Sequence, residues 1–341
     1  MLRSEMSSTP AQAIIQLRPQ RVTADALRAM LADQPHEAVR WMRAAAKAGL
    51  TPAQLVLGQL LLDGHGIARD AKAAFAWFEK AAVSGDIEAR NMVGRCYEQG
   101  WGVPADPERA TESFEIAAQV GHVWAQVNLA QMLMRSGNPE NRPRCFALFK
   151  AAAESGRSKA SLKAMNSLAR FLEEGWAGPP NPIGALFWYV KAARLGDHWA
   201  QYNLATILHR NGDPETADQW LQRAITNGDN GFRRRVARLL LTQPEANLRQ
   251  RGLDALERIA EAHQPDDLYA YGLALHEGVA GRSDPERAMA LFRMAAAKEH
   301  AEAGSRLRLT HRLAKLIAAV SRRFRFIRSA RPKPSRSKGV S

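Results

Sequence analysis

The chain has 341 residues, 46% of them apolar and 24% charged, a balance that excludes disorder throughout. Aromatic residues make up only 7%, and alanine recurs in clusters such as AAAKAG, so we expect closely packed helices and not a β-sandwich. The formal charge of +14 directs attention to anionic partners.

Residues 1–22 are predicted to be a disordered N-terminal segment. The opening sequence MLRSEMSSTPAQAIIQLRPQ lacks the basic start, apolar stretch and cleavage site of a secretory signal. The sequence also lacks a run of about 18 apolar residues that could span a membrane. Cys96 and Cys145 lie 49 residues apart and form neither a disulfide framework nor a zinc motif. We therefore expect a cytoplasmic protein, with peripheral contact at the inner membrane as an extension of that expectation.

Residues 23–300 contain an internal repeat. A glycine that follows small residues recurs at intervals of 36, 36, 35, 40 and 32, at Gly49, Gly85, Gly121, Gly156, Gly196 and Gly228. A bulky residue, most often Trp, precedes most of these glycines by eight positions. The string DPERA occurs twice in the same register, at 106–110 and 284–288. Such self-similarity is typical of repeat architectures.

Each repeat predicts two helices joined by a turn. In the repeat that starts at residue 53, one stripe of the first helix carries Ala53, Leu57, Gly58 and Leu61. Gly64 fits a left-handed helix end, and Asp70 fits the N-cap of the second helix. That second helix, residues 71–84, is expected to bury Ala74, Trp77 and Ala81. Units of this kind bury their apolar faces against their neighbours.

The best-formed repeat, residues 89–121, has all the pattern positions Gly94, Tyr97, Gly100, Gly102, Val103 and Asp106 in place. It resembles the Sel-one-like repeat, a subclass of the tetratricopeptide superfamily. The resemblance implies an all-α fold, a right-handed α-solenoid of helix-turn-helix repeats of about 36 residues over 23–300. Four repeats are complete, from Ala53, Ala89, Ala164 and Asp267. Those from Ala125, Ala200 and Phe232 lose the Gly-x-Gly turn, and a half repeat carries Trp41.

The same resemblance implies a non-enzymatic scaffold or adaptor that binds partner proteins. The alternative is a regulator or accessory protein of envelope or secretion machinery, or a secreted effector, that binds a cell-wall or glycan component. The nine histidines form no HExxH or HxH spacing, and GxSxG does not occur, so we expect no catalytic, metal or cofactor site and no small-molecule substrate. Cys96 and Cys145 are expected to be packed in the core.

In tetratricopeptide-like solenoids the first helices line a concave face. The residues predicted to bind a peptide there are Asn91, Arg95, Gln131, Asn166, Arg170, Tyr202, His209, Arg234, Arg238, Tyr269 and His276. Amides suit a peptide backbone and arginine forks suit carboxylates, so the expected partner is an acidic protein or peptide. Two other interpretations stay open: a duplication at an interval of 75 residues explains the repeated Asn and Arg, and the arginines can belong to a solvated helix face.

The C-terminal end carries the excess charge. From residue 306 onward there are twelve Lys or Arg and no Asp or Glu, and without them the chain has 36 basic and 34 acidic residues. We expect a basic amphipathic capping helix over 301–328 and a basic disordered tail over 329–341. The predicted anionic-surface residues are Arg322, Arg323, Arg325, Arg328, Arg331 and Lys333. An anionic membrane or acidic protein ranks first as the partner of this segment, above nucleic acid and above an export function.

Overall fold

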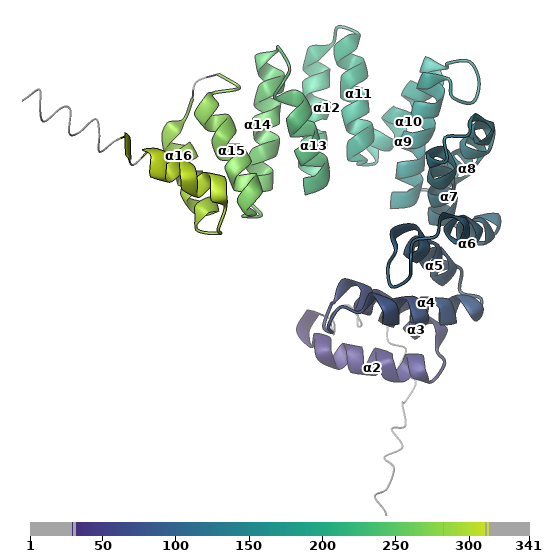
Figure 1. Cartoon of the computed structure of the whole chain (residues 1–341). Helices are drawn as coiled ribbons and strands as arrows, with labels where there is room; N and C mark the ends of the chain where they lie inside the picture. The colour runs from purple at the N-terminus through teal and green to yellow at the C-terminus, as the bar shows by residue number, and fades with distance from the viewer. Residues whose placement is uncertain (1–28, 30–31, 282, 311, 314–341) are drawn as a thin grey trace, which may run out of the picture. The chain divides into compact units, whose positions relative to one another are not determined.

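The computed structural model describes residue 29 and residues 32–281, 283–310 and 312–313. The helices form two compact bodies, one within residues 1–156 and one within 157–341. The N-terminal body contains α2 (Pro35–Lys47), α3 (Thr51–Asp63), α4 (Ala71–Val83), α5 (Ile87–Gln99), α6 (Pro107–Gln119), α7 (Val123–Arg135), the short 3-10 helix η1 (Pro139–Asn141) and α8 (Arg142–Glu154) (Figure 1).

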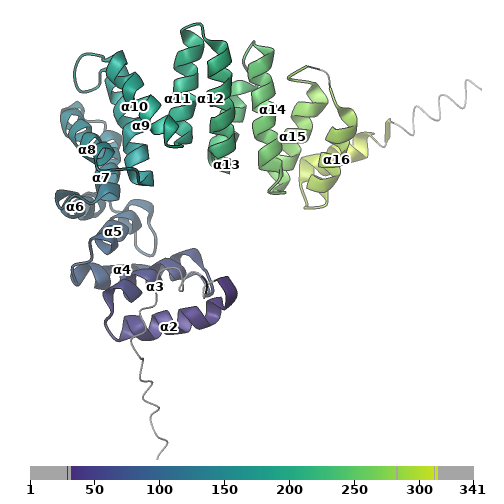
Figure 2. The ribbon, with the colours of Figure 1, turned by 180° about the vertical axis from the view of Figure 1, so that it is seen from behind.

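The C-terminal body contains α9 (Lys159–Glu174), α10 (Pro182–Arg194), α11 (His198–Arg210), α12 (Pro214–Asn227), α13 (Asn230–Leu240), α14 (Ala246–Ala260), α15 (Pro265–Glu277) and α16 (Pro285–Ala296). In both bodies neighbouring helices along the chain pack as helix-turn-helix pairs, visible from either side in Figures 1 and 2. The predicted all-α solenoid fold is confirmed.

The predicted turn chemistry is confirmed in α3–α4. Gly64 ends α3 with a φ of 73°, in the left-handed region. The Asp70 carboxylate accepts a hydrogen bond of 2.9 Å from the Ala73 N–H and so caps α4. Asp106 and Asp284 cap α6 and α16 in the same way, each followed by proline at the first helical position.

In three pairs the core joins a glycine of the first helix to a phenylalanine of the second. A Cβ added at Gly94 would lie 2.7 Å from the Phe114 ring, and Gly58 with Phe78 and Gly272 with Phe292 repeat this contact. The expected burial of Trp77 is therefore wrong: Trp77 is half-buried, whereas Phe78, the next residue, is fully buried. Gly58 leaves room for the Phe78 ring in the core. Because adjacent residues on a helix differ by about 100°, the Trp77 side chain lies at the edge of the core.

The pairs differ in the segment between their two helices. Seven residues join α3–α4 (64–70), α5–α6 (100–106), α9–α10 (175–181) and α15–α16 (278–284). Six residues, three of them in η1, join α7–α8, whereas three join α11–α12 and five join α13–α14. A Cβ added at Gly66 would lie 2.8 Å from the Pro35 oxygen at the start of α2, and one added at Gly102 would lie 2.1 Å from the Ala71 oxygen at the start of α4. A long loop thus covers the start of the second helix of the preceding pair.

Residues 301–310 continue as a helix after α16, with Ala303 buried in the core of the C-terminal body. The rest of the predicted capping helix, the segment 1–22 and the tail 329–341 lie outside the described residues. Among the helices that the structure describes, none has the length and apolar character needed to cross a membrane.

Candidate functional site

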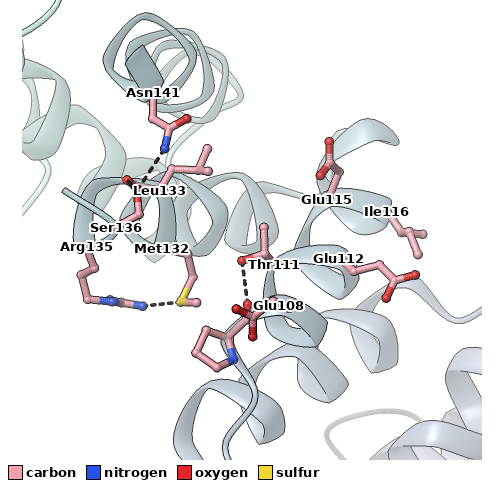
Figure 3. Close-up of a pocket in the computed structure, with 11 residues that line it drawn as sticks. Glu108, Thr111, Glu112, Glu115, Ile116, Met132, Leu133, Arg135, Ser136 and Asn141 are labelled. Carbon is pink, nitrogen blue, oxygen red and sulfur yellow. Dashed lines mark hydrogen bonds between the residues drawn. The ribbon is translucent and has the colours of Figure 1, made fainter. Parts of the chain in front are cut away.

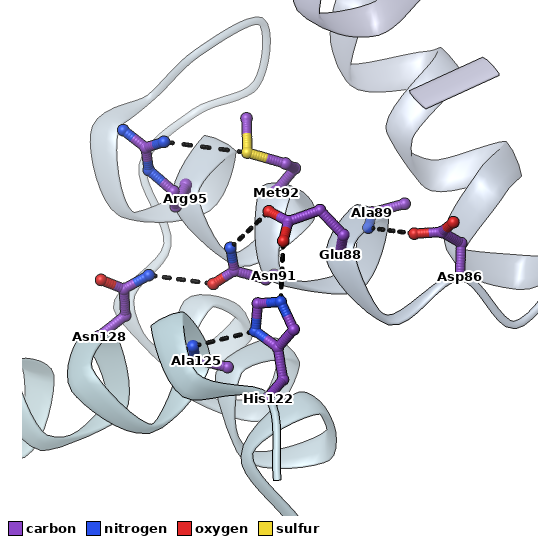
Figure 4. A network of polar contacts seen from close by, with 9 residues as sticks. All are labelled: Asp86, Glu88, Ala89, Asn91, Met92, Arg95, His122, Ala125 and Asn128. Atoms are coloured by element: carbon purple, nitrogen blue, oxygen red, sulfur yellow. Dashed lines mark hydrogen bonds and ion pairs between the residues drawn. The ribbon is translucent and has the colours of Figure 1, made fainter. Parts of the chain in front are cut away.

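The predicted residues Asn91 and Arg95 take part in a polar network between α5 and α7 (Figure 4). Asn91 is only 2% exposed. Its side-chain oxygen accepts a hydrogen bond of 3.0 Å from Asn128 of α7, and its amide donates to Glu88 at 3.2 Å. The Arg95 guanidinium lies over the Trp101 ring, 4.9 Å from its centroid. The expectation that Asn91 is open to a peptide is therefore wrong, because its amide joins two helices.

The C-terminal body contains the same network 75 residues later. Asn203 of α11 donates a hydrogen bond of 2.8 Å to Asn166 of α9, and the Arg170 guanidinium lies 5.4 Å from the centroid of Trp176. The ion pairs also correspond, since Arg135 pairs with Glu98 and Arg210 with Glu173. These repeated residues fix one first helix to the next, which supports the duplication interpretation of their spacing.

The two copies differ at two charged positions, since Glu88 and His122 of the first correspond to Lys163 and Asp197 of the second. His122 caps α7 by accepting the Ala125 N–H on Nδ1 at 3.2 Å. The neutral ring must then carry its proton on Nε2, which donates to Glu88 at 2.8 Å. This hydrogen bond lowers the pKa of Glu88. In the second copy Asp197 replaces the histidine as the cap, and burial raises the pKa of that carboxyl.

The arginines of α13 largely hold the fold together. Arg233 donates to the carbonyl oxygens of Ile225 and Thr226 at the end of α12, at 2.9 and 3.0 Å. Arg234 makes two hydrogen bonds, of 2.7 and 2.6 Å, to the carboxylate of Asp267, which is 6% exposed. Arg238 is exposed, and its Nε donates to the Arg234 carbonyl of its own helix at 3.4 Å. Of the two predicted arginines on α13, Arg238 is thus the one positioned for a ligand.

Tyr202 and His209 come together at a concavity that we call the α11–α14 groove, of about 220 Å³. Its lining comes from four helices and the turn after α13: Tyr202, Ala205, Thr206, His209, Pro214, Ala217, Asp218, Leu221, Leu239, Leu240, Gln243, Asn247 and Leu248. Leu239 is 45% exposed. Arg251 holds the Asp218 carboxylate by hydrogen bonds of 2.7 and 2.6 Å and lowers its pKa.

The other predicted residues are dispersed over the first helices. Tyr269 stacks on His300 with centroids 4.4 Å apart and accepts a hydrogen bond of 3.3 Å from Arg306, so it serves the start of the C-terminal helix. His276 on α15 is exposed, and Gln131 on α7 is half-buried. The six predicted anionic-surface residues, Arg322 to Lys333, lie outside the described residues.

A second concavity, which we call the α6–α7 groove, lies in the N-terminal body and has a volume of about 770 Å³ (Figure 3). It is lined by Pro107, Glu108, Thr111, Glu112, Glu115 and Ile116 of α6, by Met132, Leu133 and Arg135 of α7, and by Ser136 and Asn141 beyond it. None of these residues was singled out as a site from the sequence.

The signal that could have found both grooves is the missing Gly-x-Gly turn. Pro107 and Pro214 begin second helices, as Pro35 and Ala71 do, but they line grooves, and the following pairs have the connections 136–141 and 241–245 in place of a seven-residue loop. The connection 211–213 likewise follows α10, whose Ile183 is 83% exposed near the helix start. The start of a second helix is thus open where the next connection is not a seven-residue loop.

The cysteine prediction is confirmed, since both Cys96 and Cys145 are buried and unpaired. Burial raises the pKa of Cys96 to about 12 and also raises that of Cys145, so neither is activated as a thiolate. Within the part of the chain that the structure describes, no group of three His, Cys, Asp or Glu is arranged to hold a metal ion.

The family model of the Sel1 repeat matches residues 30–50, 51–86, 87–122, 125–156, 162–197, 200–229 and 265–300. The pair α13–α14 lies outside these matches, although it folds as a helix pair. The Sel1-repeat-containing protein YjcO of Escherichia coli strain K12 is 30% identical over 104 residues, 30% of this chain and 45% of that protein. The match thus spans less than half the length of this relative.

Several solved structures are similar to the chain, two of which illustrate the likeness. The Sel1 repeat protein from Oxalobacter formigenes has 23% identity and a TM-score of 0.48, with 83% of this chain and 84% of that chain covered. Yeast Tom70 has 15% identity and a TM-score of 0.51, with 88% of this chain and 61% of that chain covered. At this identity, the likeness to Tom70 concerns the fold alone.

Proposed function

Because the chain belongs to the Sel1 repeat family, whose members are generally protein-interaction scaffolds, we propose that it is a non-enzymatic scaffold that binds a segment of a partner protein in the α11–α14 groove. The observation that carries this proposal is that Tyr202 and His209 line the same groove as the exposed Leu239. A scaffold of this kind requires an open apolar surface with a few polar groups, and this groove supplies both.

The chemistry of the groove favours an acidic segment with apolar side chains. Leu221, Leu239 and Leu240 form an aliphatic lining, and an apolar side chain buried there would contribute about 25 cal/mol per Å² removed from water. The one carboxylate lining the groove, Asp218, is neutralised by Arg251. Arg238, one residue before Leu239, is exposed and can pair with a carboxylate of the ligand.

The glycan-binding alternative remains a prediction from the resemblance. Aliphatic walls would bury sugar hydroxyls without partners, which costs free energy, so this groove favours a peptide. A cytoplasmic location likewise remains a prediction.

The test is selection of peptides from a displayed library of 12-residue sequences on the full chain. We expect enrichment of acidic peptides with leucine or phenylalanine. Leu239→Glu should weaken their binding at least about tenfold, because it places a charge on the apolar wall and opposes an acidic ligand. Binding is measured by fluorescence polarisation.

The matched control is Met294→Glu, a substitution of the same kind at a side chain of α16 that is 39% exposed and does not line the groove. This variant should bind like the wild type, and thermal melts followed by circular dichroism should show both variants folded. Equal binding by the wild type and Leu239→Glu would overturn the assignment of this groove.

A further inference from the structure

The α6–α7 groove combines an apolar wall with an unneutralised acidic rim. Met132, Leu133 and Ile116 supply the apolar surface, and Ile116 is 41% exposed. Ser136 and Asn141 form a hydrogen bond of 3.0 Å with each other, which fixes the short turn at one end of the groove. This hydrogen bond thus fixes the connection 136–141 beside the apolar wall.

The charges around this groove are not balanced. Arg135 pairs with Glu98, and Arg144 pairs with Glu115. Arg109, which lies on α6 near Glu112, pairs with Asp106 and donates to the Tyr97 hydroxyl, so these three cations are already engaged. Glu108 and Glu112, one turn apart on α6, are exposed and form no side-chain ion pair among the described residues. Two negative charges at the rim therefore remain for a cationic ligand, next to surface that gains from being covered.

This chain itself contains a segment with the complementary composition. Residues 322–331 read RRFRFIRSAR, in which Phe324, Phe326 and Ile327 alternate with arginines, and the chain has no acidic residue after Glu302. We propose that residues 322–331 bind in the α6–α7 groove, from the same chain or from a second copy. Arginine forks pair with carboxylates in two-pronged geometry, and the aromatic side chains cover the apolar wall.

The consequence of this contact is competition. Arginines that pair with Glu108 and Glu112 are withdrawn from any anionic membrane, and a membrane that binds them empties the groove. The groove then acts as an internal receptor for the basic segment. This inference is independent of the α11–α14 groove, which lies in the other body.

The experiment uses the full chain with photoreactive benzoylphenylalanine in place of Phe326. After irradiation and proteolysis, mass spectrometry should find crosslinks to residues 107–116 and 132–136. Glu108→Lys with Glu112→Lys should reduce their yield at least about fivefold, because both rim charges are reversed. Adding Arg322→Glu, Arg323→Glu and Arg325→Glu to that variant should restore the yield.

The matched control is Glu286→Lys on α16, because Glu286 occupies in its DPERA string the place that Glu108 has in the first one and is also exposed. Its crosslink yield should stay within about twofold of wild type. Crosslinked monomers at all concentrations identify binding within one chain, and crosslinked dimers identify binding between copies; both support the proposal.

Vesicles containing anionic phosphatidylglycerol should lower the crosslink yield, whereas neutral phosphatidylcholine vesicles should not. Crosslinks that form elsewhere, or that persist in the Glu108→Lys and Glu112→Lys variant when it is folded by circular dichroism, would overturn the proposal. So would labelling of vesicle lipid alone without any crosslink to α6 or α7.

Discussion

The α5–α6 and α7–α8 pairs have the same helix-turn-helix plan, but they differ in what the connection between their two helices covers. In α5–α6 the loop 100–106 lies against the start of α4, with Gly102 so close to Ala71 that a Cβ would overlap the carbonyl oxygen. In α7–α8 the connection 136–141 is one residue shorter and contains the 3-10 helix η1, and the start of α6 lines a groove. Two connections of nearly equal length thus leave different surfaces at the start of the preceding helix.

The largest effect is expected from a glycine-to-alanine substitution in the loop 100–106, compared with the same substitution in the connection 136–141. Gly102→Ala should lower the free energy of unfolding by about 3 kcal/mol or more, because the methyl group meets a backbone oxygen at 2.1 Å and φ is 76°. Gly137→Ala should cost only about 1 kcal/mol, since it has a similar φ of 73° but open space around it. Urea denaturation measures both; similar losses would contradict the idea that only the long loop is packed.

Much of the fold follows from the sequence, because the same signals recur in the complete repeats. The DPERA strings give aspartate caps followed by proline, and the glycines give the helix ends and the close approach to Phe114. The exchange of Trp77 for Phe78 in the core could not be read from spacing, since adjacent positions on a helix differ by about 100° and both residues are aromatic.

Less of the candidate site could be predicted. The residues predicted for the concave face do lie on the first helices of their pairs. The sequence cannot, however, distinguish an arginine free for a ligand from one paired inside the protein. Arg234 and Arg238 lie one turn apart, and only the position of Asp267 on α15 separates their roles. The α6–α7 groove is lined by residues that match no chemical motif, so a search for such motifs passes over it.

An intermediate effect should follow from exchanging the connection 136–141 for the loop of the preceding pair. Replacing residues 136–141 with the sequence of 100–106 should cover the start of α6 and reduce crosslinking from position 326 about tenfold, equivalent to about 1.4 kcal/mol of binding. A graft of the same length made of glycine and serine is the control, because it lacks the side chains that pack. Undiminished crosslinking in a folded graft would refute the role of the short turn in opening the groove.

The smallest effect concerns the ion pair between Asp218 and Arg251 beside the α11–α14 groove. Arg251 lowers the pKa of Asp218, so the pair stabilises the fold above the unfolded pKa of Asp, near 4, and this stabilisation is lost as the pH falls below that value. Asp218→Asn should cost about 1 kcal/mol at pH 7, and its difference from wild type should shrink between about pH 4 and 2. Urea denaturation over this pH range measures the change.

The control for the acid series is Glu257→Gln, which breaks the pair of Glu257 with Arg287, where both side chains are about half exposed. Its cost should be no more than a few tenths of a kcal/mol at pH 7, as for other exposed ion pairs. A pH-independent difference for Asp218→Asn would show that the Arg251 pair does not stabilise this region.

The paired asparagines have a consequence for how such a chain grows. Asn91 with Asn128, and Asn166 with Asn203, are the same joint used twice at an interval of 75 residues. A copy of residues 91–165 inserted before Asn166 would contain its own pair of asparagines. The array can therefore lengthen by gene duplication without inventing an interface, and selection is then free to act on the connections between helices, where the grooves open.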